Sequence, residues 1–141
     1  MRLVKKGQIS TEYLIIMGFV TFLIISVLGV AFFYVSQIKD NLKVNQVNNF
    51  ANKIVNSAET VYFAGEPSKI TILLYLPQGV KSIATTSSNE LTIKILTDSG
   101  TNVISYTSSV PITASGITTT EGLKKVKLEA SPSVVTITQI T

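Results

Sequence analysis

The stretch YLIIMGFVTFLIISVLGVAFFYV, residues 13–35, decides the architecture of this chain. It contains no charged residue and no proline, and about 23 residues suffice to cross a hydrocarbon core of about 30 Å as a helix. Gly18 and Gly29 interrupt the run and lower its helix propensity in water, but they let backbones approach closely where helices pack together. The run therefore predicts an apolar helix whose natural surroundings are lipid or other helices.

The order of the segments before this run distinguishes it from a secretory leader. In a secretory signal, basic residues precede an apolar segment that ends at a cleavage site, so the apolar part is discarded. Here the basic tip, with Arg2, Lys5 and Lys6, is followed by Gly7 and a short polar stretch, and only then by the apolar run. A peptidase that cuts between Gly7 and Gln8 would remove residues 1–7 and retain the helix. The positive-inside rule keeps the basic tip cytoplasmic and places the C-terminal part outside the membrane.

Helical periodicity continues beyond the apolar run. Apolar residues recur at steps of mostly three and four: Ile38, Leu42, Val47, Phe50, Ala51, Ile54, Val55, Ala58, Val61 and Tyr62. Gly65 and Pro67 then supply a stop. We therefore expect one helix over residues 8–64, about 85 Å long. Its first half is apolar all round, and its amphipathic second half needs a domain or neighbouring helices to cover one stripe.

The rest of the chain, residues 65–141, predicts a small β domain. Short alternating or β-branched runs are separated by turn signals at roughly ten-residue intervals, which favours an antiparallel sheet or sandwich. The expected strands are Lys69–Leu76, Glu90–Leu96, Asn102–Val110, Leu123–Ala130 and Val134–Ile140. Asp98-Ser99-Gly100 is interpreted as a hairpin turn in preference to a calcium loop, because a distal Glu at the right spacing is missing. The predicted fold class is α+β, a long N-terminal helix followed by a small antiparallel β-sheet or sandwich domain.

The composition argues against an enzyme. The chain has no Cys and no His, which removes disulfides, thiolate chemistry, the commonest general base and the commonest metal ligand. Its eight acidic residues are mostly scattered singly, and no nucleophile–base pair, metal cluster or phosphate loop is visible. We therefore predict no catalytic residues, no metal site and no cofactor.

The net charge also gives no sign of a nucleic-acid partner. The formal charge is +4, from 12 basic and 8 acidic residues. Removing Arg2, Lys5 and Lys6 leaves 12 − 3 = 9 basic residues and a charge of +1. The one later basic cluster, Lys124, Lys125 and Lys127, is too weak for a nucleic-acid footprint and is interpreted as a solvated strand face and turn.

Glu12, at the edge of the apolar run, has two readings. On a plain membrane anchor, its carboxylate would sit hydrated at the level of the lipid headgroups. If Gln8 becomes the new N-terminus, however, Glu12 lies one helical turn from a free α-amine, where negative charge also suits the helix dipole. In a bundle of such helices each Glu12 needs a positive partner, because an unpaired buried charge costs several kcal/mol. The α-amine of a neighbouring copy is the natural candidate.

At these positions the chain resembles a known family. Lys5-Lys6-Gly7 followed by Gln8-Ile9-Ser10-Thr11-Glu12-Tyr13 is similar to the class III signal peptide of archaeal type IV pilins, with its Gln-x-Ser-x-Glu-Tyr pattern. The resemblance covers about residues 5–35. It implies cleavage between Gly7 and Gln8 by a membrane prepilin peptidase that recognises Lys5, Lys6, Gln8, Ser10, Glu12 and Tyr13. It also implies a type IV pilin-like fold, with Gln8 and Glu12 acting in assembly.

The resemblance further implies that the protein is located first in the membrane and later outside the cell. The precursor would sit in the cell membrane, and an assembly ATPase and a membrane platform protein would then build it into an extracellular adhesive filament, a homopolymer of this chain. The residues leave alternatives open. A minor pilin would share the same features. An archaellin-like subunit is a related possibility, although the Gln-x-Ser-x-Glu-Tyr pattern favours a pilin. A bitopic membrane protein would keep its helix in lipid and display a small binding domain.

Overall fold

The computed structural model describes the backbone of residues 5–140 and the side chains of residues 10–140. Within this range the chain forms one helix followed by seven strands, so the α+β prediction is confirmed and the arrangement is consistent with a pilin-like fold. The chain divides into two compact units, residues 1–39 and residues 40–141. The second unit contains the C-terminal part of the helix together with every described strand.

Helix α1 runs from Lys5 to Ala64, so its described start lies three residues before the expected one. Its end agrees with the prediction. Gly65 adopts a left-handed conformation with φ of +76°, and its amide donates to the carbonyl of Tyr62 at 3.0 Å. A residue in this conformation just past the last helical turn closes the helix, as the Gly-then-Pro pattern indicated.

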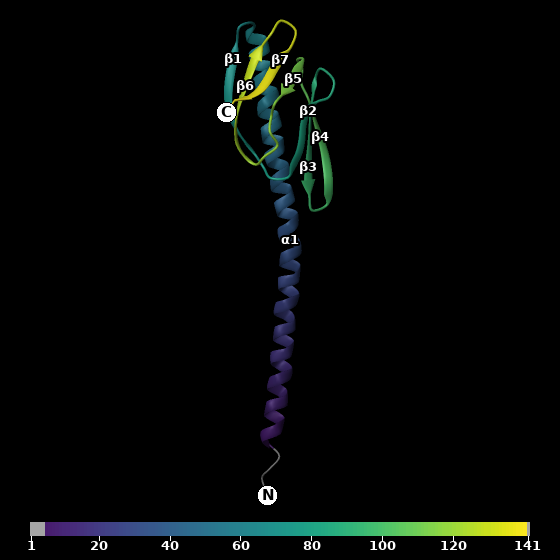
Figure 1. Ribbon diagram of the computed structural model, residues 1–141. Helices are drawn as coiled ribbons and strands as arrows, with labels where there is room; N and C mark the ends of the chain where they lie inside the picture. Colours follow the sequence, from purple (N-terminus) through teal and green to yellow (C-terminus); the bar gives the residue numbers. More distant parts are fainter. Residues whose placement is uncertain (1–4, 141) are drawn as a thin grey trace. The chain divides into compact units, whose positions relative to one another are not determined.

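Seven strands form two sheets around the helical segment of the second unit (Figure 1). The four-stranded sheet has the order β1-β6-β7-β5, and the three-stranded sheet has the order β2-β3-β4. The strands are β1 Lys69–Leu76, β2 Val80–Thr85, β3 Glu90–Thr97, β4 Gly100–Thr107, β5 Ile112–Ser115, β6 Gly122–Ala130 and β7 Val135–Ile140. Neighbours pair antiparallel except β5 and β7, which are parallel.

The helical stripe and the inner faces of both sheets share one hydrophobic core. The helix contributes seven buried residues, Val47, Phe50, Ala51, Ile54, Val55, Ala58 and Val61. The predicted stripe is therefore buried from Val47 to Val61 and partly buried at Tyr62, whereas Ile38 and Leu42 are each 56% exposed. Strand β3 follows its predicted alternation, with Leu91, Ile93 and Ile95 fully buried. The strands alone would form a marginal core, and the helix completes it.

The expected strands exist, with end points that differ by a few residues. The predicted strand over residues 102–110 begins and ends earlier, as β4, and Asp98 and Ser99 form the predicted hairpin turn between β3 and β4. Two strands were not predicted. β2 contains a bulge between Val80 and Ser82 that breaks its alternation, and β5 is only four residues long. The antiparallel prediction is wrong for the β5–β7 pair alone among the described pairs.

Gly79, in the turn before β2, is the glycine whose replacement should cost most. Its φ is +96°, and an added Cβ would lie 2.8 Å from the carbonyl oxygen of Leu96. The same turn receives the amide of Leu96, which donates to the Gly79 carbonyl at 2.8 Å. We expect Gly79→Ala to lower the free energy of unfolding by about 1–3 kcal/mol, seen as a lower thermal midpoint of the full chain in detergent.

Gly100→Ala is the matched control for Gly79→Ala. Gly100 also has a positive φ, +129°, but no described atom lies within 4 Å of an added Cβ. Gly100→Ala should therefore be destabilised only by the unfavourable backbone conformation of alanine at a positive φ. Its thermal midpoint should fall less than that of Gly79→Ala. Equal losses in the two variants would contradict the close-contact explanation.

Candidate functional site

The apolar segment of α1 is exposed along its whole length in a single copy. The described helix is long and apolar enough to span a membrane, and none of its most apolar window is buried. Its large side chains are strongly exposed, including Phe19 at 62%, Phe32 at 73% and Phe33 at 68%. Exposed apolar surface of this extent is typical of segments that contact lipid or other apolar chains, so the helix could span a membrane.

The helix itself satisfies the hydroxyls of Thr21 and Ser26 within this segment. The hydroxyl of Thr21 donates to the carbonyl of Met17, and the hydroxyl of Ser26 donates to the carbonyl of Phe22, each at 2.8 Å. Such bonds to the preceding turn spare a hydroxyl the cost of entering an apolar medium unpaired. The helix can thus present Thr21 and Ser26 to lipid or to a neighbouring helix without a polar penalty.

The predicted recognition residues lie at the start of this helix. Ser10, Glu12 and Tyr13 are exposed, and Tyr13 is 64% exposed. The backbone of residues 5–9 is helical, whereas the side chains of Lys5, Lys6 and Gln8 lie outside the described residues. The backbone places positions 8 and 12 one turn apart on the same helix face.

Asp40 opens the second unit and ties the helix to a hairpin, which the sequence did not indicate. Both of its carboxylate oxygens accept the backbone amide of Asp98, at 3.2 and 3.0 Å. The ammonium of Lys43 lies 3.8 Å from the same carboxylate. Asp40 is the first acidic residue after the apolar run, and its position in the sequence gave no hint of a partner 58 residues away.

A second carboxylate on the helix holds the loop between β4 and β5. Glu59 accepts hydrogen bonds from the amide of Ser109 at 2.9 Å and from its hydroxyl at 2.8 Å. These bonds, first from the backbone and then from the side chain, lower the pKa of Glu59. Tyr106 of β4 donates its hydroxyl to the side-chain oxygen of Asn48. Together with Asp40, these residues attach the three-stranded sheet and its following loop along the helix.

The prediction that Lys124 lies on a solvated face is wrong. Lys124 is only 6% exposed, and its ammonium donates to the hydroxyls of Thr118 at 2.8 Å and Thr120 at 2.7 Å. Alternation along β6 places Lys124 on the inner face with Val126, and the loop over residues 116–121 covers it. Thr118 in turn donates to Gln139 at 2.9 Å. Lys124 thus anchors a loop, which explains why a lysine is tolerated at an inward position.

Lys127, by contrast, takes part in an ion network on the outer face of the same sheet. The two carboxylate oxygens of Glu129 each lie 2.7 Å from an ammonium nitrogen, one from that of Lys69 and the other from that of Lys127. Hydrogen bonds from Lys127 and then from Lys69 lower the pKa of Glu129 to about 2. Because a lowered carboxyl pKa stabilises the fold only while the group is ionised, this contribution is present at neutral pH and is lost as the pH falls toward 2. Solvent screening keeps it small.

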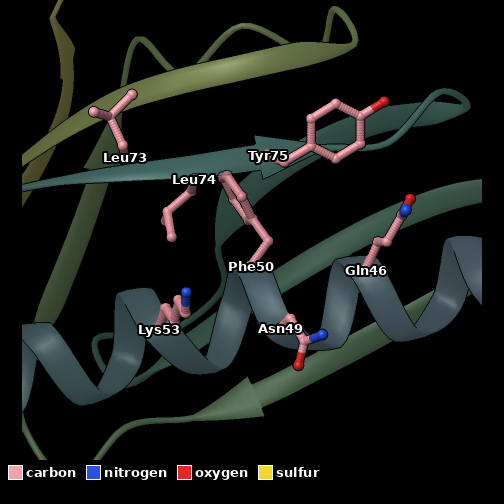
Figure 2. A pocket seen from close by; sticks show the side chains of 7 residues that line it. All are labelled: Gln46, Asn49, Phe50, Lys53, Leu73, Leu74 and Tyr75. Atoms are coloured by element: carbon pink, nitrogen blue, oxygen red, sulfur yellow. The ribbon is translucent and has the colours of Figure 1, made fainter.

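A shallow groove runs between the helix and strand β1 (Figure 2). Its volume is about 260 Å³, and its lining is Gln46, Asn49, Phe50, Lys53, Leu73, Leu74 and Tyr75. Leu74 points toward the helix, whereas Leu73 and Tyr75 point away from it (Figure 2). The lining holds no carboxylate and offers no arrangement of a nucleophile with a base. The groove is bordered by strand β1, which is an edge strand of the four-stranded sheet.

Comparison of the chain with protein-family models finds none that matches, and comparison with curated proteins and with solved structures likewise finds no match. The function therefore rests on the residues and the geometry described above.

Proposed function

We propose that this chain is a structural subunit of an archaeal type IV pilus. Its precursor would be cleaved between Gly7 and Gln8 by a prepilin peptidase, and its apolar helix would then assemble into the shaft of an extracellular adhesive filament. The observation that carries the proposal is the combination of the Gln-x-Ser-x-Glu-Tyr pattern at residues 8–13 with a fully exposed apolar helical segment directly behind it.

The exposed segment explains how one helix serves both stages. In the membrane, lipid covers the side chains of residues 13–35; in a filament, the same side chains pack against identical helices. The exchange is nearly neutral in hydrophobic free energy, since lipid tails are as apolar as leucine. Helix packing, the two glycines and charge pairing would therefore decide the outcome, and extraction from the membrane would require the assembly ATPase and its platform protein.

Charge pairing at the helix start gives the filament its register. Glu12 is the single charged residue between Gln8 and Ile38. In a bundle of these helices its carboxylate would be surrounded by apolar side chains unless a cation lies beside it. The α-amine created at Gln8 by cleavage is the cation that every copy brings. We assign Glu12 to this pairing and Gln8 to both cleavage and assembly.

A bitopic membrane protein with a small binding domain is the alternative from another class. The groove beside β1 supports this alternative, because a displayed domain needs a surface for a partner. Abundance in purified filaments would separate a major subunit from a minor pilin, which shares the same sequence features. The Gln-x-Ser-x-Glu-Tyr pattern at residues 8–13 favours a pilin over an archaellin-like subunit.

Mechanical shearing of intact cells tests the proposal. A filament subunit should be released without detergent, sediment as long fibres and be visible by electron microscopy. An anchored protein should remain with the cells until detergent dissolves the membrane. Recovery of the chain in the detergent fraction alone would contradict the proposed function.

A further inference from the structure

The two sheets leave four edge strands, and these differ in how well they are protected. β5 is only four residues long and β2 contains a bulge, and these two strands contact one another. β1 and β4 are each eight residues long and keep an unbroken register with their neighbours. Proteins usually guard long edges with charges, prolines or bulges, yet Lys69 is the one charged residue in these two strands.

The free backbone groups of β1 can be assigned from its register. Alternate residues of an edge strand point their N–H and C=O groups away from the sheet. The amide of Ala130 donates to the carbonyl of Ser68 at 3.0 Å, which makes the even-numbered residues of β1 the ones bonded to β6. Thr71, Leu73 and Tyr75 therefore direct their backbone groups to the open edge.

The same argument applies to β4. The amide of Ser108 donates to the carbonyl of Asn89 at 2.7 Å and continues the β3–β4 register. Even-numbered residues of β4 are thus bonded to β3, and Thr101, Val103 and Ser105 face the open edge. Among the described residues, no further hydrogen bond satisfies the backbone groups along either edge.

The directions of the two strands suit a polar assembly. β1 and β4 lie on opposite flanks of the helical segment of this unit (Figure 1). β1 runs back along the helix (Figure 2), as β3 does (Figure 1), and β4 is antiparallel to β3. β1 and β4 therefore run in opposite directions. Copies that all point the same way along a filament can consequently bring β1 of one beside β4 of the next as an antiparallel pair.

We propose that strand β1 of one copy pairs with strand β4 of a second copy and joins their sheets across the filament surface. This inference rests on the proposed function. With the two strands aligned end to end, Leu73 lies opposite Val103 of the neighbouring copy. Both residues direct their backbone groups to the open edge, and both side chains are on outer faces, 65% and 58% exposed. The backbone hydrogen bonds and the apolar contact therefore both favour the register that places Leu73 opposite Val103.

One strand pair is too small a contact to hold two copies together in the absence of the filament. One pair of eight-residue strands buries well below the roughly 800 Å² per partner of a stable interface. The bundled helices would supply the missing affinity by holding the edges at high effective concentration. Because the two edges differ, the contact runs head to tail and propagates instead of closing into a dimer.

Cysteine crosslinking of the full chain in filaments tests the pairing, and the natural absence of cysteine keeps the background clean. The variant is Leu73→Cys with Val103→Cys. Residues directly opposite in an antiparallel pair have Cα atoms about 5.5 Å apart, within the disulfide range. Mild oxidation of sheared filaments should shift most chains from monomer to a ladder of covalent multimers on a denaturing gel without reductant. The pairs of Val103→Cys with Thr71→Cys or Tyr75→Cys cover a register shifted by two residues.

The control is Leu123→Cys with Val103→Cys. Leu123 is 72% exposed on the same outer face, opposite Tyr75, but belongs to β6 and is separated from the edge by β1. It should give no ladder, and neither should any single substitution. Filaments that form normally but yield no ladder from any of the three β1 positions would overturn the strand pairing and leave the proposed function intact. Failure of the unsubstituted chain to form filaments would overturn both.

Discussion

Replacing Glu12 by Ala should abolish filaments while the chain remains in the membrane. Removing one member of a buried charge pair costs about 3–5 kcal/mol, because the other charge is left without a partner. That loss corresponds to association at least about 100-fold weaker at every addition of a subunit. Glu12→Lys should be at least as damaging, since it places a second positive charge beside the Gln8 amine. The measurement is the amount of chain in the sheared fibre fraction relative to the membrane fraction.

Glu66→Ala provides the control for the Glu12 variants. Glu66 is an exposed carboxylate just past the end of the helix, and its loss should leave the fibre yield unchanged. The mass of the membrane-bound Glu12 variants shows whether residues 1–7 have been removed. A cleaved chain that fails to assemble supports the pairing role, whereas normal filaments from Glu12→Ala would show that the role is wrong.

Replacing Phe50 by Ala should have the largest effect on the second unit. Phe50 is 2% exposed and is among the largest side chains that the helix contributes to the shared core. Truncation of a buried Phe costs about 3–5 kcal/mol, a large share of the roughly 5–15 kcal/mol that stabilises a typical domain. The thermal midpoint of the full chain in detergent, followed by the near-ultraviolet circular dichroism of its tyrosines, should fall by roughly 15–30 °C.

Phe63→Ala on the same helix is the control for Phe50→Ala. It makes the same change in helix propensity without removing a buried side chain. Phe63 is 75% exposed, so its truncation should change the free energy of unfolding by no more than about 0.5 kcal/mol. If the two variants lost stability equally, the helix would not form part of the core in the way that the structure shows.

The sequence predicted the elements whose periodicity is strong. The helix end at Gly65 followed from a backbone requirement, and the buried stripe from Val47 to Val61 followed from spacing. The inward residues of β3 followed from alternation. The bulged β2 was not predicted because its alternation is broken, and β5 was not predicted because four residues are too few for alternation to indicate a strand. The parallel β5–β7 pair could not be predicted, since pairing partners are set by tertiary packing and not by the strands themselves.

The candidate site likewise contains some features that the sequence predicts and others that it does not. Residues 8–13 and the apolar run were recognisable because their order along the chain carries the information. The ties made by Asp40 and Glu59 were invisible, because their partners lie 58 and 50 residues away. Lys124 was misjudged because a lysine beside two other lysines resembles a solvated face. Its inward position depends on the placement of β6 and on the hydroxyls of Thr118 and Thr120, which solvate its ammonium.

The mass of the N-terminal peptide from surface-sheared material tests the central claim most directly. A retained apolar helix freed of its basic tip predicts an N-terminal peptide that begins at Gln8. A chain that still begins at Met1 and is recovered only with detergent would contradict the account and leave a membrane anchor in its place.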